Sequence, residues 1–129
     1  MRQNISSGSP WEDIVGYSRA VRLGNIVEVA GTTAMDGDEL IGKGDIYRQA
    51  VFIFEKIEKA LITAGAAMQD VVRTRMFVTD ITQWEAVGKA HGEFFKTIKP
   101  VATMVEVSRL IDDDLLIEIE VTAIIDAQK

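Results

Sequence analysis

Two glutamates on one predicted strand and two arginines on another are the side chains best suited to chemistry in this sequence. The stretch LLIEIEVTAII alternates in polarity, so Glu118 and Glu120 share one face of a strand. Arg73 and Arg75 share a polar face of DVVRTRMFVTD in the same way. A carboxylate in a cleft can hold a water and act as a general acid or base. The pattern leaves Glu118 open as a catalytic group or as an ion-pair partner of the arginines.

His91 is the single histidine of the chain, and its ordinary pKa would suit general-base catalysis at neutral pH. It falls on the apolar stripe of a predicted helix, which favours a buried, hydrogen-bonded histidine. The chain has no cysteine, and one histidine cannot form a two-histidine site. The sequence therefore predicts no metal site.

The composition fits one folded domain, predicted to span residues 1–129 with residues 1–13 as an N-terminal extension. Hydrophobic residues make up 47% of the chain, and 20 acidic against 14 basic side chains give a formal charge of −6. Nucleic acids are bound mainly through Lys and Arg, so this balance disfavours a nucleic-acid partner. No apolar run reaches the ~18 residues of a membrane span. The absence of cysteine fits a reducing cytoplasm.

The elements that must position these side chains follow from periodicity and turn residues. The sequence predicts strands flanking the turn 24–25, a loop over 31–45, a helix over 46–64, a strand over 70–80, a helix beginning near 82, and strands over 101–107 and 115–125. Asp45 is the expected N-cap of the first helix, and Gly65 follows its end. The order β-β-α-β-α-β-β predicts an α+β fold, a two-layer α/β sandwich with helices on one face of a sheet.

Side-chain faces follow from the same periodicity. One face of the strand 70–80 is predicted to carry Val72, Thr74, Met76 and Val78. One side of the second helix is predicted to carry Trp84, Val87, His91, Phe94 and Phe95. The strand face is expected to pack against the helices, and Trp84, Phe94 and Phe95 are expected in the core or at an interface.

Four segments resemble a known family. GYSRAVRLGNIVEVAGTTA, RTRMFVTDI, FF…P and VEVSRL…LIEIEVTAI occur in the order and spacing of the RidA/YjgF family, also known as L-PSP endoribonuclease or translation inhibitor proteins. The similarity spans about residues 14–125. It implies a chorismate-mutase-like fold assembled as a homotrimer with clefts between subunits. Its enzymes hydrolyse 2-imino and enamine acids to keto acids and ammonia, and need no metal or cofactor.

The same resemblance implies a substrate site. Tyr17 matches the tyrosine of the family, Gly31 the backbone amide after the second strand, and Glu118 the carboxylate that holds water. Thr103 falls where a small hydroxyl residue follows the family's arginine, and Thr32 adds a hydroxyl beside Gly31.

The arginine that grips the substrate carboxylate in the active relatives is missing, because Ala102 stands in its position. Two charge-assisted hydrogen bonds of about 1.5–3 kcal/mol each would be lost, which weakens an imino-acid complex by roughly two to four decades. Arg75, or else Arg73, could replace that arginine, although pairing with the glutamates is the favoured interpretation. His91 is a further candidate for substrate contact.

The sequence therefore leaves enzyme activity open. The leading prediction is a RidA-family protein that binds a small carbonyl, imine or carboxylate metabolite in an intersubunit cleft. It would be a weak or altered imine/enamine deaminase, or a ligand-binding protein without turnover. A stress-related interaction protein is a separate alternative. Endoribonuclease or translation-inhibitor activity is disfavoured by the negative charge and the single histidine.

Overall fold

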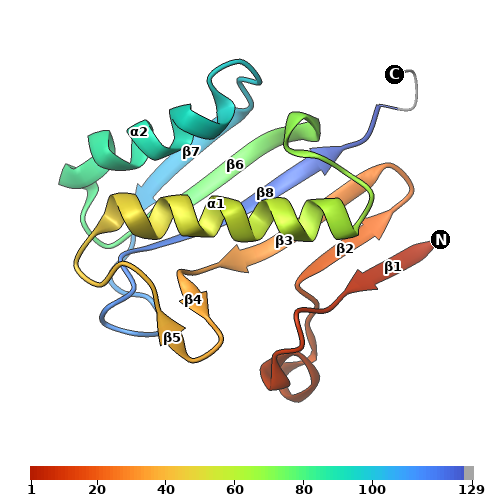
Figure 1. Ribbon diagram of the computed structural model, residues 1–129, viewed down its shortest axis with the longest axis horizontal. Coiled ribbons are helices and arrows are strands. Elements are labelled where there is room, and N and C mark those ends of the chain that lie inside the picture. Colours follow the sequence, from red (N-terminus) through yellow and green to blue (C-terminus); the bar gives the residue numbers. More distant parts are fainter. Residues whose placement is uncertain (127–129) are drawn as a thin grey trace.

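The computed structural model describes residues 1–126, and its two long helices lie on one face of a six-stranded sheet (Figure 1). The strands of this sheet are β1 (Arg2–Ile5), β2 (Ala20–Leu23), β3 (Ile26–Thr32), β6 (Val71–Val78), β7 (Val101–Glu106) and β8 (Ile117–Ile124). The helices are α1 (Ile46–Thr63) and α2 (Trp84–Phe95), with short helical turns η1 (Glu12–Gly16), η2 (Met68–Asp70) and η3 (Ile81–Gln83). The predicted α+β two-layer architecture is confirmed. The last three residues of the predicted domain, 127–129, lie outside the described residues.

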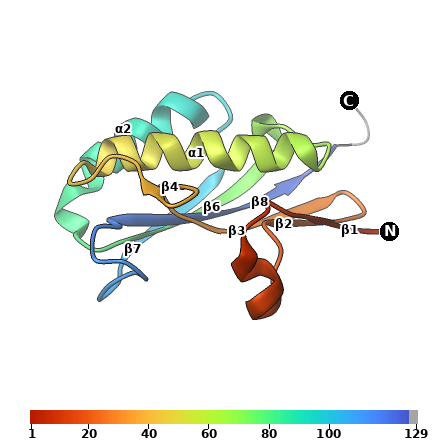
Figure 2. The same ribbon diagram turned by 60° about the horizontal axis from the view of Figure 1, so that its bottom comes forward.

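The strand order in the sheet is β1-β2-β3-β8-β6-β7. Neighbouring strands are antiparallel except for β6 and β7, which run parallel and are joined through α2 as a crossover. The predicted hairpin between β2 and β3 turns at Gly24 and Asn25, and Gly24 has the positive φ of 62° that this tight turn requires. Figure 2 shows both helices above the sheet, whereas η1 projects from the opposite side. We call this opposite side the open face.

Helix α1 forms because its apolar residues fall on one stripe. Its buried apolar residues are Ile46, Ala50, Ile53, Phe54, Ile57, Ala60 and Leu61. The Asp45 side chain accepts a hydrogen bond from the Arg48 backbone N–H at 3.1 Å, as its predicted cap role requires. The stripe packs against Ile117, Ile119, Val121 and Ala123 of β8, which are also buried. Glu118, Glu120 and Thr122 therefore face the open side of the sheet, as their alternation predicts.

A buried glutamine ties α1 to the start of β8. Gln49 Oε1 accepts a hydrogen bond from the Leu116 N–H at 2.9 Å, and its Nε2 donates to Asp114 O at 3.0 Å and to Gly42 O at 3.1 Å. These bonds satisfy three backbone groups where the chain enters the sheet. They fix the entry of β8 two residues before Glu118.

Two segments predicted to lie outside regular structure contain strands. Residues 2–5 of the predicted N-terminal extension form β1, which pairs with β2 from Arg2↔Leu23 to Ile5↔Ala20. The predicted loop 31–45 contains β4 (Met35–Asp36) and β5 (Glu39–Leu40), a separate two-stranded hairpin. Both strand pairs are short, so alternation over two to four residues gave little signal.

One predicted core position, Val72, is wrong. Val72 is 40% exposed, because the register between β6 and β8 shifts between Val71 and Arg73 and turns Val72 outward. Trp84, expected in the core or at an interface, is the first residue of α2 and is 56% exposed in the single chain. Met76 and Val78 are buried as predicted.

No helix within residues 1–126 is long and apolar enough to cross a membrane. The same residues contain no group of three or more His, Asp or Glu side chains placed to hold a metal ion.

Candidate functional site at a bulge of β3

A bulge in β3 brings a backbone segment against the carboxylate of Glu118. Val29 pairs with Val121 and Thr32 pairs with Ile119, so Ala30 and Gly31 together oppose one residue of β8. A Cβ on Gly31 would overlap the Glu118 carboxylate, with Oε2 the closest atom. Glycine leaves room for the carboxylate in this position, and any larger residue would displace the Glu118 side chain. The structure thus places two of the predicted site residues, Gly31 and Glu118, in contact.

Glu118 is half-buried, and its charge is only partly compensated. Within residues 1–126 its carboxylate forms no hydrogen bond and no ion pair, and its oxygens are not fully buried. Burial raises the pKa of Glu118, the positive charge of Arg19 opposes that rise, and the negative charge of Glu120 adds to it. A carboxylate with a raised pKa that still reaches solvent is suited to accept a proton from water.

Arg19 lies at the same bulge, and the sequence interpretation missed it. Its Nη2 donates to Gly31 O at 2.6 Å, while its Nε is buried without a hydrogen-bond partner in the described part of the chain. Burial lowers the pKa of the Arg19 guanidinium, and Tyr17, Glu12 and Glu118 oppose that shift. A signal was present, since Arg19 stands two residues after Tyr17 and alternates with the buried Ala20.

Tyr17 is held at this end of the sheet by the turn η1. Its backbone N–H donates to Glu12 O at 3.0 Å, and the Glu12 carboxylate accepts from the Ser7 backbone N–H at 3.0 Å and the Ser7 hydroxyl at 2.5 Å. Desolvation would raise the pKa of Glu12, but these hydrogen bonds outweigh it and lower the pKa. Tyr17 is 40% exposed and influences Arg19 electrostatically, so it borders the same site.

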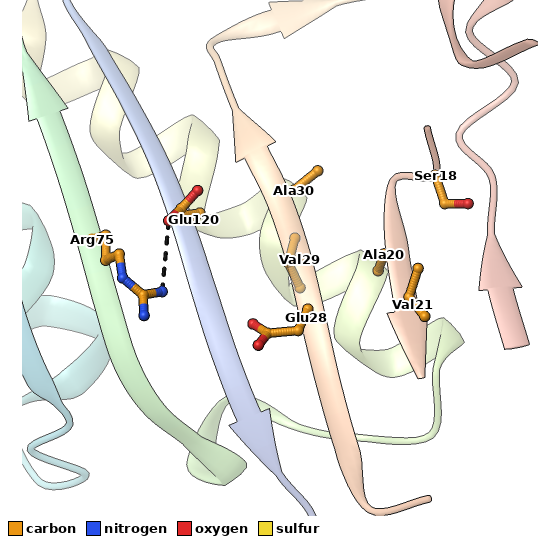
Figure 3. A pocket seen from close by; sticks show the side chains of 8 residues that line it. All are labelled: Ser18, Ala20, Val21, Glu28, Val29, Ala30, Arg75 and Glu120. Carbon is orange, nitrogen blue, oxygen red and sulfur yellow. Dashed lines mark ion pairs between the residues drawn. The ribbon is translucent and has the colours of Figure 1, made fainter. Parts of the chain in front are cut away.

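Arg75 lies beside the bulge in a depression of the open face (Figure 3). The lining residues are Ser18, Ala20, Val21, Glu28, Val29, Ala30, Arg75 and Glu120. Arg75 Nη1 lies 3.6 Å from Glu120 Oε1, and both side chains are more than a third exposed. The favoured interpretation of Arg75, pairing with a glutamate across the sheet, agrees with this contact. An exposed pair of this kind adds little stability.

Thr103 stands apart from the bulge within one subunit. The register aligns Gly31 of β3, Glu120 of β8, Arg75 of β6 and Thr103 of β7 in one row across the sheet. Three strand spacings separate Gly31 from Thr103, which is about 14 Å. Ala102 is exposed and pairs with Thr74, whose side chain faces the helices. A small ligand therefore cannot touch Gly31 and β7 of the same subunit at once.

The sequence matches the family model described as Endoribonuclease L-PSP over residues 9–125. The chain belongs to the RidA/YjgF family. A RutC family protein of Pyrococcus abyssi is 38% identical over 83% of this chain and 84% of that protein. The 3-aminoacrylate deaminase RutC of Acinetobacter baylyi is 29% identical over 89% of this chain and 90% of that protein.

A solved structure extends the likeness to the fold of this RidA/YjgF protein. A Mycobacterium tuberculosis protein, described as a member of the highly conserved YjgF/YER057c/UK114 family, superposes with a TM-score of 0.88. The two chains are 50% identical, and the match covers 97% of this chain and 100% of that one. The RidA-like fold expected from the four sequence segments is confirmed.

Two further candidates, His91 and Thr32, lie on the helix side of the sheet. His91 Nε2 is 2.9 Å from the Thr74 hydroxyl, and its ring centroid is 4.8 Å from that of Phe95. Burial lowers the pKa of His91. Thr32 is buried, and its hydroxyl donates to Ala30 O at 2.7 Å. The structure does not bring either residue to Glu118, and their contacts hold the core and the bulge.

Proposed function

We propose that this protein binds a small carbonyl, imine or carboxylate metabolite beside Glu118 and hydrolyses the C=N bond of 2-imino acids, including those formed when enamine acids tautomerise. The observation that carries the proposal is the half-buried Glu118 carboxylate against Gly31, which has no ion pair within residues 1–126. The deaminase name of the Acinetobacter relative supports the same class of reaction.

The chemistry needs one group to move protons. Water adds to C2 of the iminium group while Glu118 accepts one of its protons. Glu118 then returns this proton to the nitrogen, the C2–N bond breaks, and ammonia leaves with the bonding electrons. The hydroxyl proton is lost as the carbonyl of the keto acid forms. A raised pKa makes Glu118 a stronger base for the first step and leaves it able to give the proton back.

The site is proposed to be completed by a second copy of the chain. Thr103 and the Gly31 bulge are about 14 Å apart in one subunit, so a small ligand could contact both only across an interface. The open face also exposes Leu23, Ile26, Val101, Val105 and Ile124. Apolar residues gathered on one sheet face are typical of a contact surface. The homotrimer implied by the family resemblance would provide such an interface.

The decisive experiment generates 2-iminobutanoate with a threonine dehydratase and follows 2-oxobutanoate formation with and without this protein. Wild type should raise the rate above the uncatalysed background. Glu118→Gln should lose about 100-fold or more of that increment, the usual contribution of a general base. Glu55→Gln, an exposed change on the far side of α1, is the matched control and should keep the wild-type rate. Equal rates for wild type and Glu118→Gln would contradict the proposal.

Ligand binding without turnover is the second candidate, and the observation that favours it is Ala102 in place of the family arginine. Under this alternative the wild type shows no rate increment, yet binds the keto acid in a manner that Glu118→Gln alters. RNA cleavage has weaker support, because the formal charge of −6 opposes phosphate binding.

A further inference from the structure

We propose that Arg19 is the anion anchor of this site and binds the carboxylate of a 2-oxo or 2-imino acid in the role left open by Ala102. The inference rests on the proposed function, because it names the residue that selects acids at the same site. Neither the family resemblance nor the periodicity of the sequence assigns Arg19 a role.

The guanidinium of Arg19 is held in place with most of its donors free. A guanidinium has five N–H donors. In the described part of the chain the one hydrogen bond made by the Arg19 side chain runs from Nη2 to Gly31 O, at 2.6 Å. Nε is buried without a partner, whereas Nη1 is not fully buried and also has none. The Nη1 side is therefore the edge from which an anion could be bound.

Arg19 also lacks an ion-pair partner in the described part of the chain. Within residues 1–126 no carboxylate approaches it closely enough to form an ion pair, although Glu12 and Glu118 lie near enough to influence its pKa. A half-buried charge without a partner is costly, and an incoming carboxylate would relieve that cost. The same carboxylate would stand beside Glu118, which carries the proposed water.

The other nearby cations are already occupied. Arg75 pairs with Glu120 at 3.6 Å. Lys56 donates from Nζ to Met35 O at 2.8 Å, and burial together with the charge of Arg19 lowers its pKa. Arg22 donates to Ala64 O and Gly24 O. Of these four groups, Arg19 is the one that donates to the bulge at Gly31, and unlike Arg75 it has no ion pair within residues 1–126.

The test compares an acid with its uncharged analogue. Calorimetric titrations of 2-oxobutanoate and 2-oxobutanamide are run on wild type, Arg19→Gln, Arg19→Lys, Arg75→Gln and the control Arg22→Gln. Wild type should bind the acid at least 10-fold more tightly than the amide. Arg19→Gln should lose about 10- to 100-fold in affinity for the acid and almost none for the amide. Arg19→Lys keeps the charge but not the planar fork and should lie between the two.

Several outcomes would overturn the anchor. If wild type binds the acid and the amide with equal affinity, Arg19 is not an anion anchor. The same conclusion follows if Arg19→Gln binds the acid as tightly as wild type. Loss of the acid preference in Arg75→Gln alone would assign the anchor to β6. If the Arg19→Gln oligomer dissociates, Arg19 forms an ion pair with a carboxylate of a second copy instead of binding the ligand. If wild type binds neither compound, the proposed function fails and the anchor fails with it.

Discussion

At the scale of single residues, Glu118 carries an electrostatic cost that its own subunit relieves only in part. The carboxylate is half-buried, stands near Glu120, and has no ion pair within residues 1–126. Arg19 lowers that cost from a distance without a direct bond. This charge makes the folded state less stable than a neutral residue at the same position would. Functional sites often carry such a cost in stability.

This cost can be measured as a pH dependence of stability. The folded pKa of Glu118 is raised above its ordinary value of 4.5, so the folded state binds its proton more tightly than the unfolded state. The penalty is therefore absent below pH 4.5 and reaches its full size as the pH rises through the folded pKa. Glu118→Gln should be more stable than wild type by about 0.5–1 kcal/mol at pH 7, and this gain should vanish near pH 4.5.

Urea unfolding of both proteins at pH 7 and at pH 4.5 checks this expectation. Taking the difference between variant and wild type cancels the titration of all other groups. Glu55→Gln, an exposed change on α1, is the matched control and should change stability by less than about 0.5 kcal/mol. A Glu118→Gln variant that is less stable than wild type at pH 7 would show that the carboxylate has a stabilising partner.

The residues of the site were only partly predictable from the sequence. Alternation placed Glu118 on the polar face correctly, because β8 has no bulge and its buried residues alternate without interruption. Arg19 was missed because its contact with Gly31 depends on the bulge in β3, which strand periodicity does not encode. The surroundings of His91 were predicted, since a single histidine on an apolar helix stripe packs into the core.

At the scale of elements, the entry of β8 depends on one side chain of α1. Gln49 satisfies Leu116 N–H, Asp114 O and Gly42 O, and it is fully buried. Gln49→Leu keeps a similar volume but leaves three backbone groups unpaired, so it should destabilise the protein by about 2–4 kcal/mol. Because β8 carries Glu118, activity should fall even at temperatures where the variant is folded.

Thermal or urea unfolding together with the 2-iminobutanoate assay tests this coupling. Gln69→Leu is the matched control, since Gln69 is exposed and its substitution should change stability by less than about 0.5 kcal/mol. A Gln49→Leu variant with wild-type stability would mean that water replaces the side chain at these backbone groups.

Element types were predicted well, and element limits less so. Helix α1 has a long apolar stripe and a cap at Asp45, so its limits agree with the prediction to within one residue. The short strands β1, β4 and β5 have too few residues for alternation to be recognised, and they are fixed by pairing with neighbours. The exposure of Val72 was also not predictable from alternation, since it follows from the register between β6 and β8.

At the scale of the whole molecule, the layer arrangement makes the open face available for assembly. Both long helices cover one side of the sheet, so the apolar residues of the other side remain exposed in a single chain (Figure 2). The row from Gly31 to Thr103 also crosses this face. One contact between copies would therefore cover the apolar residues and complete the proposed site.

We expect light scattering to give a mass of about 43 kDa for wild type, three chains of 14.2 kDa. Val105→Asp places a charge on the open face of the edge strand β7, where Val105 is 42% exposed, and should shift the mass toward that of one chain. Binding of 2-oxobutanoate should weaken with the same protein-concentration dependence as the assembly, because the site then lacks its second copy. Ile62→Asp, at a 62% exposed position on α1, is the matched control and should keep both the mass and the binding. A wild-type mass of 14.2 kDa, or binding that persists in a monomeric Val105→Asp protein, would place the whole site within one chain.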